Sequence, residues 1–230
     1  MNSGFPSYTV IIPALNAQDT ISQLINQLQT IENPPAHIFV IDDGSVDNTK
    51  ILAENNRAAV FKFTENQGKG KALQKGFELF QNNTSDPLLI CMDADLQHTP
   101  AAINVFLEKA NNLGNVFIIG SREIKIGKMP VMRFLSNKIT SSILSKLTGQ
   151  KIKDSQCGFR LIPRNILKEN FFKEKGFQFE SEFILWCSKE KIPIEFVDIP
   201  TIYNSHGSSI NHIGDTYRFI KLIIREIFTR

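Results

Sequence analysis

Two aspartates separated by one residue follow a short apolar run near the middle of the 230-residue chain. The run 88–92 has the length of a buried strand, and Asp93 and Asp95 come directly after it. Successive side chains of an extended segment point to opposite sides, so both carboxylates project to the same side. Paired carboxylates suit Mg²⁺ or Mn²⁺ that also binds the phosphates of a substrate. The alternative for these two residues alone is an acidic turn exposed to solvent.

A second apolar run, 38–41, also ends on two acids, Asp42 and Asp43. Ligands of open α/β sheets bind outside the carboxyl ends of the strands, so we expect both acidic pairs in one crevice. Paired carboxylates repel each other, and a nucleotide would offset that cost if one acid accepts a base N–H or ribose hydroxyl. The alternative is an Asp-Asp-Gly turn followed by a helix cap at Ser45 or Asp47.

Basic groups are predicted at the same edge. Residues 68–71, Gly-Lys-Gly-Lys, open a helix and offer backbone N–H groups and the Lys69 ammonium to a phosphate. The glycine spacing and the ending differ from the P-loop pattern. Arg122 ends a later apolar run and could reach the same crevice. The alternatives are a solvated helix start and a surface arginine.

Apolar runs and helical periods alternate through the first half of the chain, which predicts an α/β fold with a mostly parallel sheet and helices on both faces. Predicted strands cover 8–12, 38–41, 59–63, 88–92 and 116–119. Predicted helices cover 19–28, 49–56, 68–80 and 100–111, with Pro13 ending the first strand and Asp19 and Thr99 as helix caps. Later elements are predicted at 135–147 (helix), 159–162 (strand), 182–189 (helix), 194–199 (strand) and 215–227 (helix). We expect one domain over 1–230, whose second half, from about residue 123, completes the site of the first half, about 1–122.

Composition is that of an ordinary globular protein, with 42% hydrophobic and 21% charged residues. A net charge of +3 is too weak to indicate a nucleic-acid partner. No signal-peptide pattern and no run of about 20 apolar residues is visible, so a cytoplasmic protein is expected. The three cysteines are widely spaced, which favours buried, reduced thiols.

One stretch, 128–168, carries nine basic residues and one acid, Asp154. Together with the apolar stripe of the helix at 135–147, it suits an element that rests on an anionic membrane surface. The alternative is a helix that buries its stripe in the core. Core packing, contact within a homodimer and membrane contact all fit the final helix. The basic residues are Lys128, Arg133, Lys138, Lys146, Lys151, Lys153, Arg160, Arg164 and Lys168.

Taken together, these motifs resemble family 2 glycosyltransferases of the GT-A fold. The chain is most similar to the branch of dolichyl- or polyprenyl-phosphate mannose and glucose synthases. The resemblance covers nearly the whole chain, in the family's order. The matching segments are 10–16, 41–49, 66–70, 93–98, 120–122, 154–160 and 177–182.

The resemblance implies roles for individual residues. The nucleotide-sugar donor would contact Pro13, Leu15, Asp42, Asp43, Lys69, Asp93, Ala94 and Gln97. The divalent metal, Mg²⁺ or Mn²⁺, would be held by Asp93, Asp95 and Gln97. Catalytic roles would fall to Asp95, Arg122, Arg160, Glu182 and Asp154. Dolichyl-phosphate mannose synthases usually carry Tyr and Glu where this chain has Leu15 and Ala17, so the donor stays open between UDP- and GDP-sugars.

The implied function is metal-dependent, inverting transfer of a mannose- or glucose-class sugar to a polyprenyl phosphate, at the inner face of the cell membrane. A second hypothesis replaces the lipid phosphate with a saccharide hydroxyl, for which Glu182, Glu180 or Asp154 would act as base. A third hypothesis is a non-catalytic protein that binds sugar nucleotides. The intact pair Asp93 and Asp95 disfavours the third.

Overall fold

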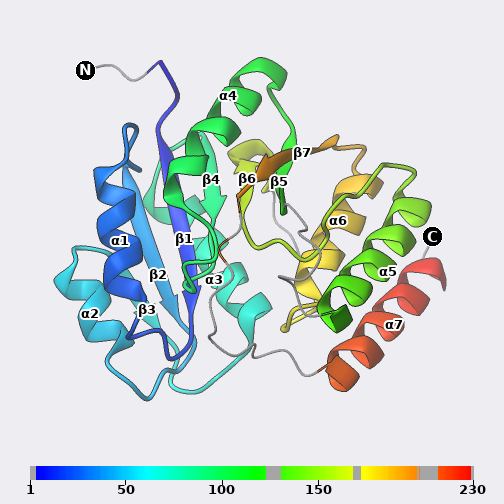
Figure 1. The fold of residues 1–230 in the computed structure, drawn as a ribbon, viewed down its shortest axis with the longest axis horizontal. Coiled ribbons are helices and arrows are strands. Elements are labelled where there is room, and N and C mark those ends of the chain that lie inside the picture. The colour runs from blue at the N-terminus through cyan, green and yellow to red at the C-terminus, as the bar shows by residue number, and fades with distance from the viewer. Residues whose placement is uncertain (1–3, 123–130, 168–171, 201, 203–211, 229–230) are drawn as a thin grey trace.

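The computed structural model describes residues 4–122, 131–167, 172–200, 202 and 212–228. These residues form a seven-stranded sheet of order β3-β2-β1-β4-β6-β5-β7 (Figure 1). All neighbouring strands in it are parallel except β6, which runs antiparallel to β4 and to β5. The predicted α/β fold with a mostly parallel sheet is confirmed. The strands are β1 (Tyr8–Ala14), β2 (His37–Asp42), β3 (Ala59–Lys62), β4 (Leu88–Cys91), β5 (Phe117–Arg122), β6 (Arg160–Pro163) and β7 (Ile194–Ile199).

Helices pack around this sheet. The helix α3 lies against β1 and β2, and α5, α6 and α7 lie together beyond the β7 end of the sheet (Figure 1). Short 3₁₀ turns precede α4, at Pro100–Ala102, and follow β6, at Arg164–Ile166. The helices are α1 (Ile21–Thr30), α2 (Thr49–Asn55), α3 (Lys69–Asn83), α4 (Ile103–Leu113), α5 (Val131–Thr148), α6 (Phe179–Lys189) and α7 (His212–Phe228).

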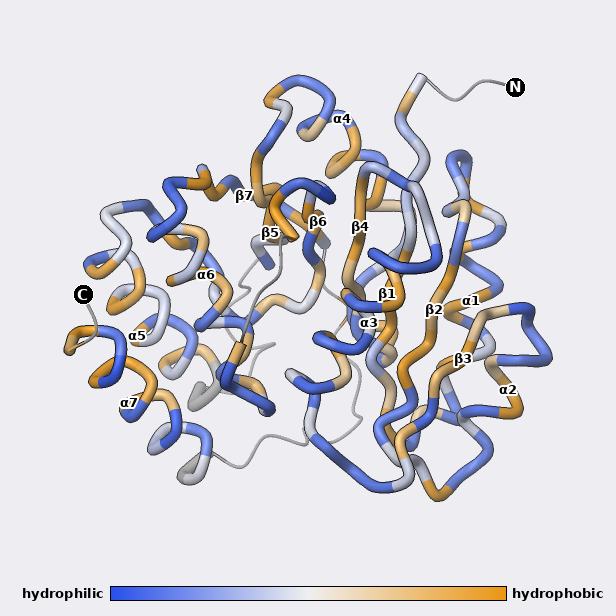
Figure 2. Tube along the Cα trace, turned by 180° about the vertical axis from the view of Figure 1, so that it is seen from behind, coloured by the Kyte–Doolittle hydropathy of each residue, from blue (hydrophilic) through white to orange (hydrophobic). Residues whose placement is uncertain are grey.

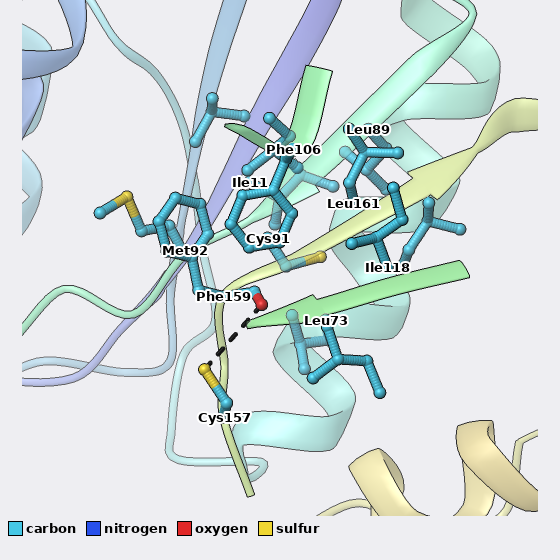
Figure 3. Close-up of a cluster of buried hydrophobic side chains, with 14 of the residues drawn as sticks. Ile11, Leu73, Leu89, Cys91, Met92, Phe106, Ile118, Cys157, Phe159 and Leu161 are labelled. Carbon is cyan, nitrogen blue, oxygen red and sulfur yellow. Dashed lines mark hydrogen bonds between the residues drawn. The ribbon is translucent and has the colours of Figure 1, made fainter. Parts of the chain in front are cut away.

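The central strands are buried because both faces of the sheet are covered, and β4 is a continuous apolar run. All four residues of β4 and all four of β6 are buried. Around them Phe106 stacks on Phe159 with ring centroids 4.5 Å apart, close to Cys91 and Met92 (Figure 3). Each of the three cysteines is free and buried, as the sequence predicts. Hydropathy drawn along the chain shows the apolar strands at the centre (Figure 2).

Several predicted boundaries were wrong by one to four residues, among them the start of α6, which is Phe179 and not Glu182. Three of these differences have a local cause. The first strand continues through Pro13, which pairs with Ile41, because a parallel neighbour bonds only alternate N–H groups. The first helix begins at Ile21 after Thr20 and not after Asp19, because a turn at Ala17 accepts the first N–H groups. The helix expected to begin at Pro100 opens with a 3₁₀ turn, and its α-helical part begins at 103.

Among the described helices, none combines the length and the apolar character that a membrane crossing would require.

Packing of α3 on β1 generates a stability prediction. A Cβ added at Gly76 would lie 2.6 Å from Cγ2 of the fully buried Ile11. Alanine gains about 1 kcal/mol of helix propensity over glycine, yet overpacking a core costs about 1–3 kcal/mol. We expect Gly76→Ala to lower the free energy of unfolding, measured by urea denaturation.

The matched control is Gly4→Ala, because a Cβ at Gly4 would meet nothing within 4 Å. We expect this control to leave the urea midpoint unchanged. A Gly76→Ala protein as stable as the parent would contradict the close approach of α3 to β1.

Candidate active site

Charged side chains gather at the carboxyl edge of the parallel strands. Asp42 is the last residue of β2, and Asp93 follows the end of β4 by two residues. The strand β6 enters this edge with its first residue, because it runs antiparallel, and so Arg160 stands between Cys91 of β4 and Ile119 of β5. The structure therefore brings both acidic pairs and the predicted arginines to one edge.

Asp42 stabilises the turn that follows β2. It is fully buried, and its Oδ1 accepts a hydrogen bond from the N–H of Ser45 at 2.8 Å. Its Oδ2 lies 3.5 Å from Nζ of Lys62 on the neighbouring strand β3. Its Oδ1 thus has a hydrogen-bond partner within the fold, whereas the buried Oδ2 accepts no hydrogen bond from the described residues. A contact of Asp42 with a nucleoside stays a prediction.

Asp43 holds the loop that leads into α3. Its two oxygens accept hydrogen bonds from the N–H groups of Gln67 and Gly68, at 2.7 and 2.9 Å. Burial raises the pKa of Asp43 above its ordinary value, against the lowering effect of these two N–H donors. Gly44 has φ +78°, and a Cβ there would lie 2.5 Å from the carbonyl carbon of Glu65. The acidic turn and the start of α3 therefore form one unit.

The loops after β1 and β2 are joined by hydrogen bonds. Asn16, at φ +50°, accepts from the N–H of Val46, and its own N–H donates to the Ser45 hydroxyl. Pro13 and the 41%-exposed Leu15 therefore lie beside a loop that is fixed to the second acidic pair. Sequence reasoning missed Asn16. An asparagine just after a strand, where a positive φ is common, was the available signal.

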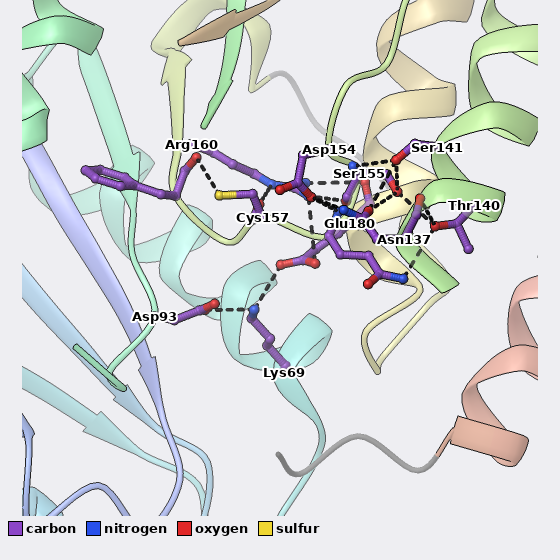
Figure 4. A network of polar contacts seen from close by, with 12 residues as sticks. Lys69, Asp93, Asn137, Thr140, Ser141, Asp154, Ser155, Cys157, Arg160 and Glu180 are labelled. Atoms are coloured by element: carbon purple, nitrogen blue, oxygen red, sulfur yellow. Dashed lines mark hydrogen bonds and ion pairs between the residues drawn. The ribbon is translucent and has the colours of Figure 1, made fainter. Parts of the chain in front are cut away.

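Lys69 lies between two carboxylates. Its Nζ is 2.7 Å from Oδ1 of Asp93 and 2.9 Å from Oε1 of Glu180 (Figure 4). Burial opposes the charged form of Lys69, but the two carboxylates raise its pKa above the ordinary value. Burial likewise acts to raise the pKa of Asp93, and the Lys69 ammonium overcomes it, so the net pKa is lowered. Both groups are therefore charged at neutral pH.

Backbone geometry sets the positions of the acidic pair after β4. A Cβ at Gly158 would overlap the Asp93 carboxylate, so any larger residue there would displace this side chain. Asp95 accepts a hydrogen bond from the N–H of Gln97 at 3.0 Å. Leu96 between them has φ +58°, and Ala94 is buried. Gly158 was missed as a site residue, although it lies within the matching segment 154–160.

Arg122 forms a buried ion pair with Asp154. Its Nε and Nη2 lie 2.7 and 2.9 Å from the two carboxylate oxygens, and Asn137 of α5 donates to the same carboxylate at 2.9 Å. Burial acts against both charges. Each nevertheless favours the other, so the pKa of Arg122 is raised and that of Asp154 is lowered. Asp154 thus orients Arg122, and a contact of Arg122 with phosphate stays a prediction.

Arg160 connects the loop before β6 to α6. It is buried and donates to the carbonyl oxygens of Cys157 and Ser155, at 2.8 and 2.9 Å. Its Nη1 donates to the carbonyl of Glu180 at 3.3 Å, and its Nη2 lies 3.7 Å from Oε2 of the same residue. These bonds fix the guanidinium within the fold, and its contact with phosphate stays a prediction.

Glu182 holds a different part of the second half. Its carboxylate accepts from the N–H groups of Lys173 and Glu174 and lies 2.7 Å from Arg225 of α7. Burial raises the pKa of Glu182 above its ordinary value despite these partners. These partners belong to the 173–174 loop and α7, so its predicted acceptor-side role stays open.

His98 is buried beside the acidic pair. Its Nε2 lies 3.8 Å from Sγ of Cys157, and burial lowers the pKa of His98 to about 4. Burial also raises the pKa of Cys157 to about 12, so both groups are neutral at physiological pH.

A divalent cation fits the acidic pair only with help from a ligand. No cluster of three or more His, Cys, Asp or Glu side chains suited to a metal is found in the described part of the chain. Asp93 already binds a cationic group, the Lys69 ammonium, which shows that its carboxylate accepts a positive charge. Mg²⁺ in proteins is commonly bound by one or two carboxylates plus substrate phosphates and water. Asp93, Asp95 and the Gln97 amide would supply the protein's share.

A cavity of about 440 Å³ lies elsewhere, along α3 and the strand β3. Neither acidic pair lines it. Its lining residues are Phe61, Phe63, Lys71, Gln74, Lys75, Phe77, Glu78, Gln81, Leu167 and Phe172.

Comparison with known proteins decides the family. The model of glycosyl transferase family 2 matches residues 9–171. The chain belongs to this family. It is therefore a glycosyltransferase, and the predicted branch of polyprenyl-phosphate sugar transferases is supported by named relatives.

Two relatives illustrate the branch. The UDP-N-acetylglucosamine--dolichyl-phosphate N-acetylglucosaminyltransferase of Methanococcus voltae is 31% identical over 86% of this chain and 86% of its own length. The polyprenol monophosphomannose synthase of Mycolicibacterium smegmatis is 28% identical over 82% of this chain and 77% of its own.

Among solved structures, the glucosyl-3-phosphoglycerate synthase of Mycobacterium tuberculosis, in complex with Mn²⁺, UDP and phosphoglyceric acid, has a TM-score of 0.73 to this chain. The matched region covers 97% of this chain and 78% of that enzyme's chain, at 17% sequence identity. A likeness at this identity establishes the GT-A fold.

The pair of Arg122 and Asp154 generates a stability prediction. Removing one partner of a buried ion pair leaves the other charge uncompensated, so we expect Asp154→Asn to cost about 3 kcal/mol at neutral pH. The pKa of Asp154 is lowered in the folded state, so its contribution is complete above the unfolded pKa of about 4 and is lost as the pH falls further. The difference in unfolding free energy between parent and variant should shrink below about pH 4.

Asp198→Asn is the control, because the side chain of Asp198 is 78% exposed and its ion pair with Lys153 is long, at 3.5 Å. It should change stability little at any pH. A difference for Asp154→Asn that stays constant from neutral to acid pH would contradict an ionised Asp154.

Proposed function

We propose that the protein transfers a sugar from a nucleoside-diphosphate donor to the phosphate of a polyprenyl phosphate, with inversion at the anomeric carbon. Support for the acceptor comes from the relatives, whose names specify dolichyl phosphate and polyprenol. Support for a uridine donor comes from one of those names and from the UDP complex of the structural neighbour. The UDP-sugars are therefore the first donors to test, followed by GDP-mannose.

The observation that carries the choice of acceptor is the pairing of the three candidate bases. Asp154 is held by Arg122, Glu182 by Arg225, and Glu180 by Lys69. A sugar hydroxyl needs a carboxylate free to take its proton, within about 3 Å. A lipid phosphate is already an anion at neutral pH and needs no base. The arrangement therefore favours a phosphate acceptor over a hydroxyl.

In the proposed reaction, a phosphate oxygen of the acceptor forms a bond to the anomeric carbon. The bond from that carbon to the donor diphosphate breaks on the opposite face, and its electron pair leaves with the nucleoside diphosphate. A cation held by Asp93, Asp95 and Gln97 would neutralise the charge of the leaving group. The Lys69 ammonium lies next to Asp93 and suits the same phosphates, whereas the Lys71 N–H at this helix start donates to the carbonyl of Lys175.

The test incubates labelled donor, Mn²⁺ and a short polyprenyl phosphate with the protein, and measures label extracted into organic solvent. We expect lipid-linked label with the parent and a loss of at least about 100-fold with Asp95→Ala, because the leaving group loses its cation. Asp198→Ala removes an exposed carboxylate and is the matched control, which should retain full activity.

Two outcomes would contradict the proposal. Transfer to a saccharide with no lipid-linked product would favour the hydroxyl acceptor. Equal lipid-linked label from the parent and from Asp95→Ala would exclude the acidic pair as the centre of the reaction.

We also propose that α7 rests on an anionic membrane surface, where a polyprenyl phosphate would be presented. Its inner positions Phe219 and Leu222 are buried, whereas a row of apolar residues faces outward on the opposite side. Figure 2 shows apolar positions along α7 at the margin of the molecule. The outward residues are Tyr217, Ile220, Ile224, Ile227 and Phe228, which are 51–83% exposed.

Charge favours lipid over a second copy of the chain as the occupant. The exposed positions of α7 include Arg218 and Lys221 and no acid. Exposed lysines also occur on α5, at Lys138 and Lys146; this helix, like α7, contacts α6. Two such faces would repel each other, whereas anionic lipid attracts them by about 1 kcal/mol per basic residue.

Some residues of the basic stretch do not contribute to this face. Arg160 is buried, and Arg164 donates to the carbonyl oxygens of Phe80 and Thr84 at the end of α3. Lys128, Lys168 and the Arg133 side chain lie outside the described part of the chain. The apolar stripe of α5 is divided, because Leu144 is buried while Leu135 and Ile139 are exposed, so core packing accounts for only part of it.

Flotation with vesicles of phosphatidylglycerol and phosphatidylcholine tests this face. Ile224→Asp should reduce the bound fraction several-fold, because it places an acid at the centre of the apolar row. Ile51→Asp is the matched control, since Ile51 is similarly exposed, at 57% against 51% for Ile224, but lies on α2 at the far side of the sheet (Figure 1). Equal loss in both variants, or a dimer in solution that Ile224→Asp dissociates, would contradict the lipid assignment.

A further inference from the structure

The Asp93 carboxylate, which would bind the divalent cation, is already paired with a positive group of the protein. Nζ of Lys69 lies 2.7 Å from Oδ1 of Asp93, at the first residue of α3 (Figure 4). The Lys69 side chain is 16% exposed and the Asp93 side chain 26%, so solvent screens this pair only in part. A cation that binds Asp93 therefore meets an ammonium already paired with the same carboxylate.

Glu180 gives the same ammonium a second partner. Its Oε1 lies 2.9 Å from Nζ of Lys69, while its Oε2 lies 3.7 Å from Arg160. Arg160 is fixed by its bonds to the carbonyl groups of Ser155 and Cys157. Glu180 is thus held in place on α6, and Lys69 keeps a counter-charge even when Asp93 is withdrawn.

We propose that Lys69 acts as an internal counter-cation for Asp93 before the metal binds, and that Glu180 is a positioning residue that receives the ammonium when the metal displaces it. A mostly buried ammonium without a counter-charge is costly. Glu180 lowers that cost, and so it makes Asp93 available to the metal. This inference rests on the proposed metal-dependent function.

Coupling between metal and donor follows. A nucleoside diphosphate offers Lys69 anionic oxygens beside the same carboxylate, so its binding also draws the ammonium from Asp93. A ligand that draws the Lys69 ammonium away from Asp93 therefore strengthens metal binding, and bound metal strengthens the binding of that ligand by the same factor. Lys69 therefore weakens metal binding in the free protein and contributes to the tightening that the donor produces.

The test measures the Kd of Mn²⁺ by electron paramagnetic resonance in the full-length protein, with and without UDP. Lys69→Met should lower the Kd without UDP about tenfold and reduce the further tightening by UDP. Glu180→Gln should raise the Kd several-fold in the parent. In the Lys69→Met background Glu180→Gln should change the Kd less than about twofold, because its effect passes through Lys69.

Lys71→Met is the matched control. It removes the same charge from the same end of α3, but Lys71 lines the separate cavity along β3. If the Kd of Mn²⁺ changed equally in Lys71→Met and Lys69→Met, the loss of any positive charge near the start of α3 would explain the change. That result would overturn the proposal. Equal effects of Glu180→Gln in both backgrounds would overturn it as well. Circular dichroism establishes that each variant folds. If Lys69→Met does not fold, Glu180→Gln alone still tests whether the Kd of Mn²⁺ rises, as the proposal requires.

Failure of this inference is distinguishable from failure of the proposed function. If the parent transfers sugar and binds Mn²⁺ through Asp95, but Lys69→Met leaves the Kd unchanged, only the counter-cation role of Lys69 would be overturned. A parent that binds no Mn²⁺ with or without UDP would overturn both.

Discussion

The ammonium of Lys69, set between Asp93 and Glu180, is the interaction on which the site depends. It connects the start of α3, the end of β4 and the first turn of α6, three segments that lie far apart in the chain. Acids that collect at a partly covered sheet edge repel each other and lose hydration, so the fold must supply positive groups among them. Lys69 supplies one from within the first half, and Arg160 supplies another from the second.

Alternation of charge continues beyond this centre. From Asp93 the signs alternate through Lys69 and Glu180 to Arg160, and a separate pair joins Arg122 to Asp154. The strong charges of the site therefore have partners before any ligand arrives. A ligand with phosphates and a cation would exchange one set of pairings for another, without bringing an uncompensated charge into the protein. Such an arrangement suits a reaction in which negative charge shifts from one phosphate group to another.

Local sequence patterns predicted the main strands and helices, and they failed where contacts between residues far apart in the chain determine the structure. The strand at 194–199 and the acidic ends of β2 and β4 follow from apolar runs with abrupt polar endings. That Arg122 pairs with Asp154, 32 positions away, has no local signature. The hydrogen bonds that Asp43 accepts from the loop before α3 likewise have no local signature, because an exposed and a buried Asp-Asp-Gly turn have the same sequence.

The antiparallel strand β6 has a consequence for how the sheet is assembled. It pairs Leu88–Cys91 of β4 on one side and Ile118–Ile119 of β5 on the other. Within the described sheet, β5 adjoins only β6 and β7, both of which come later in the chain. During synthesis, β4 and β5 therefore have unpaired edges until residues near 160 leave the ribosome. A truncated chain that ends after β5 would expose both strands to intermolecular pairing.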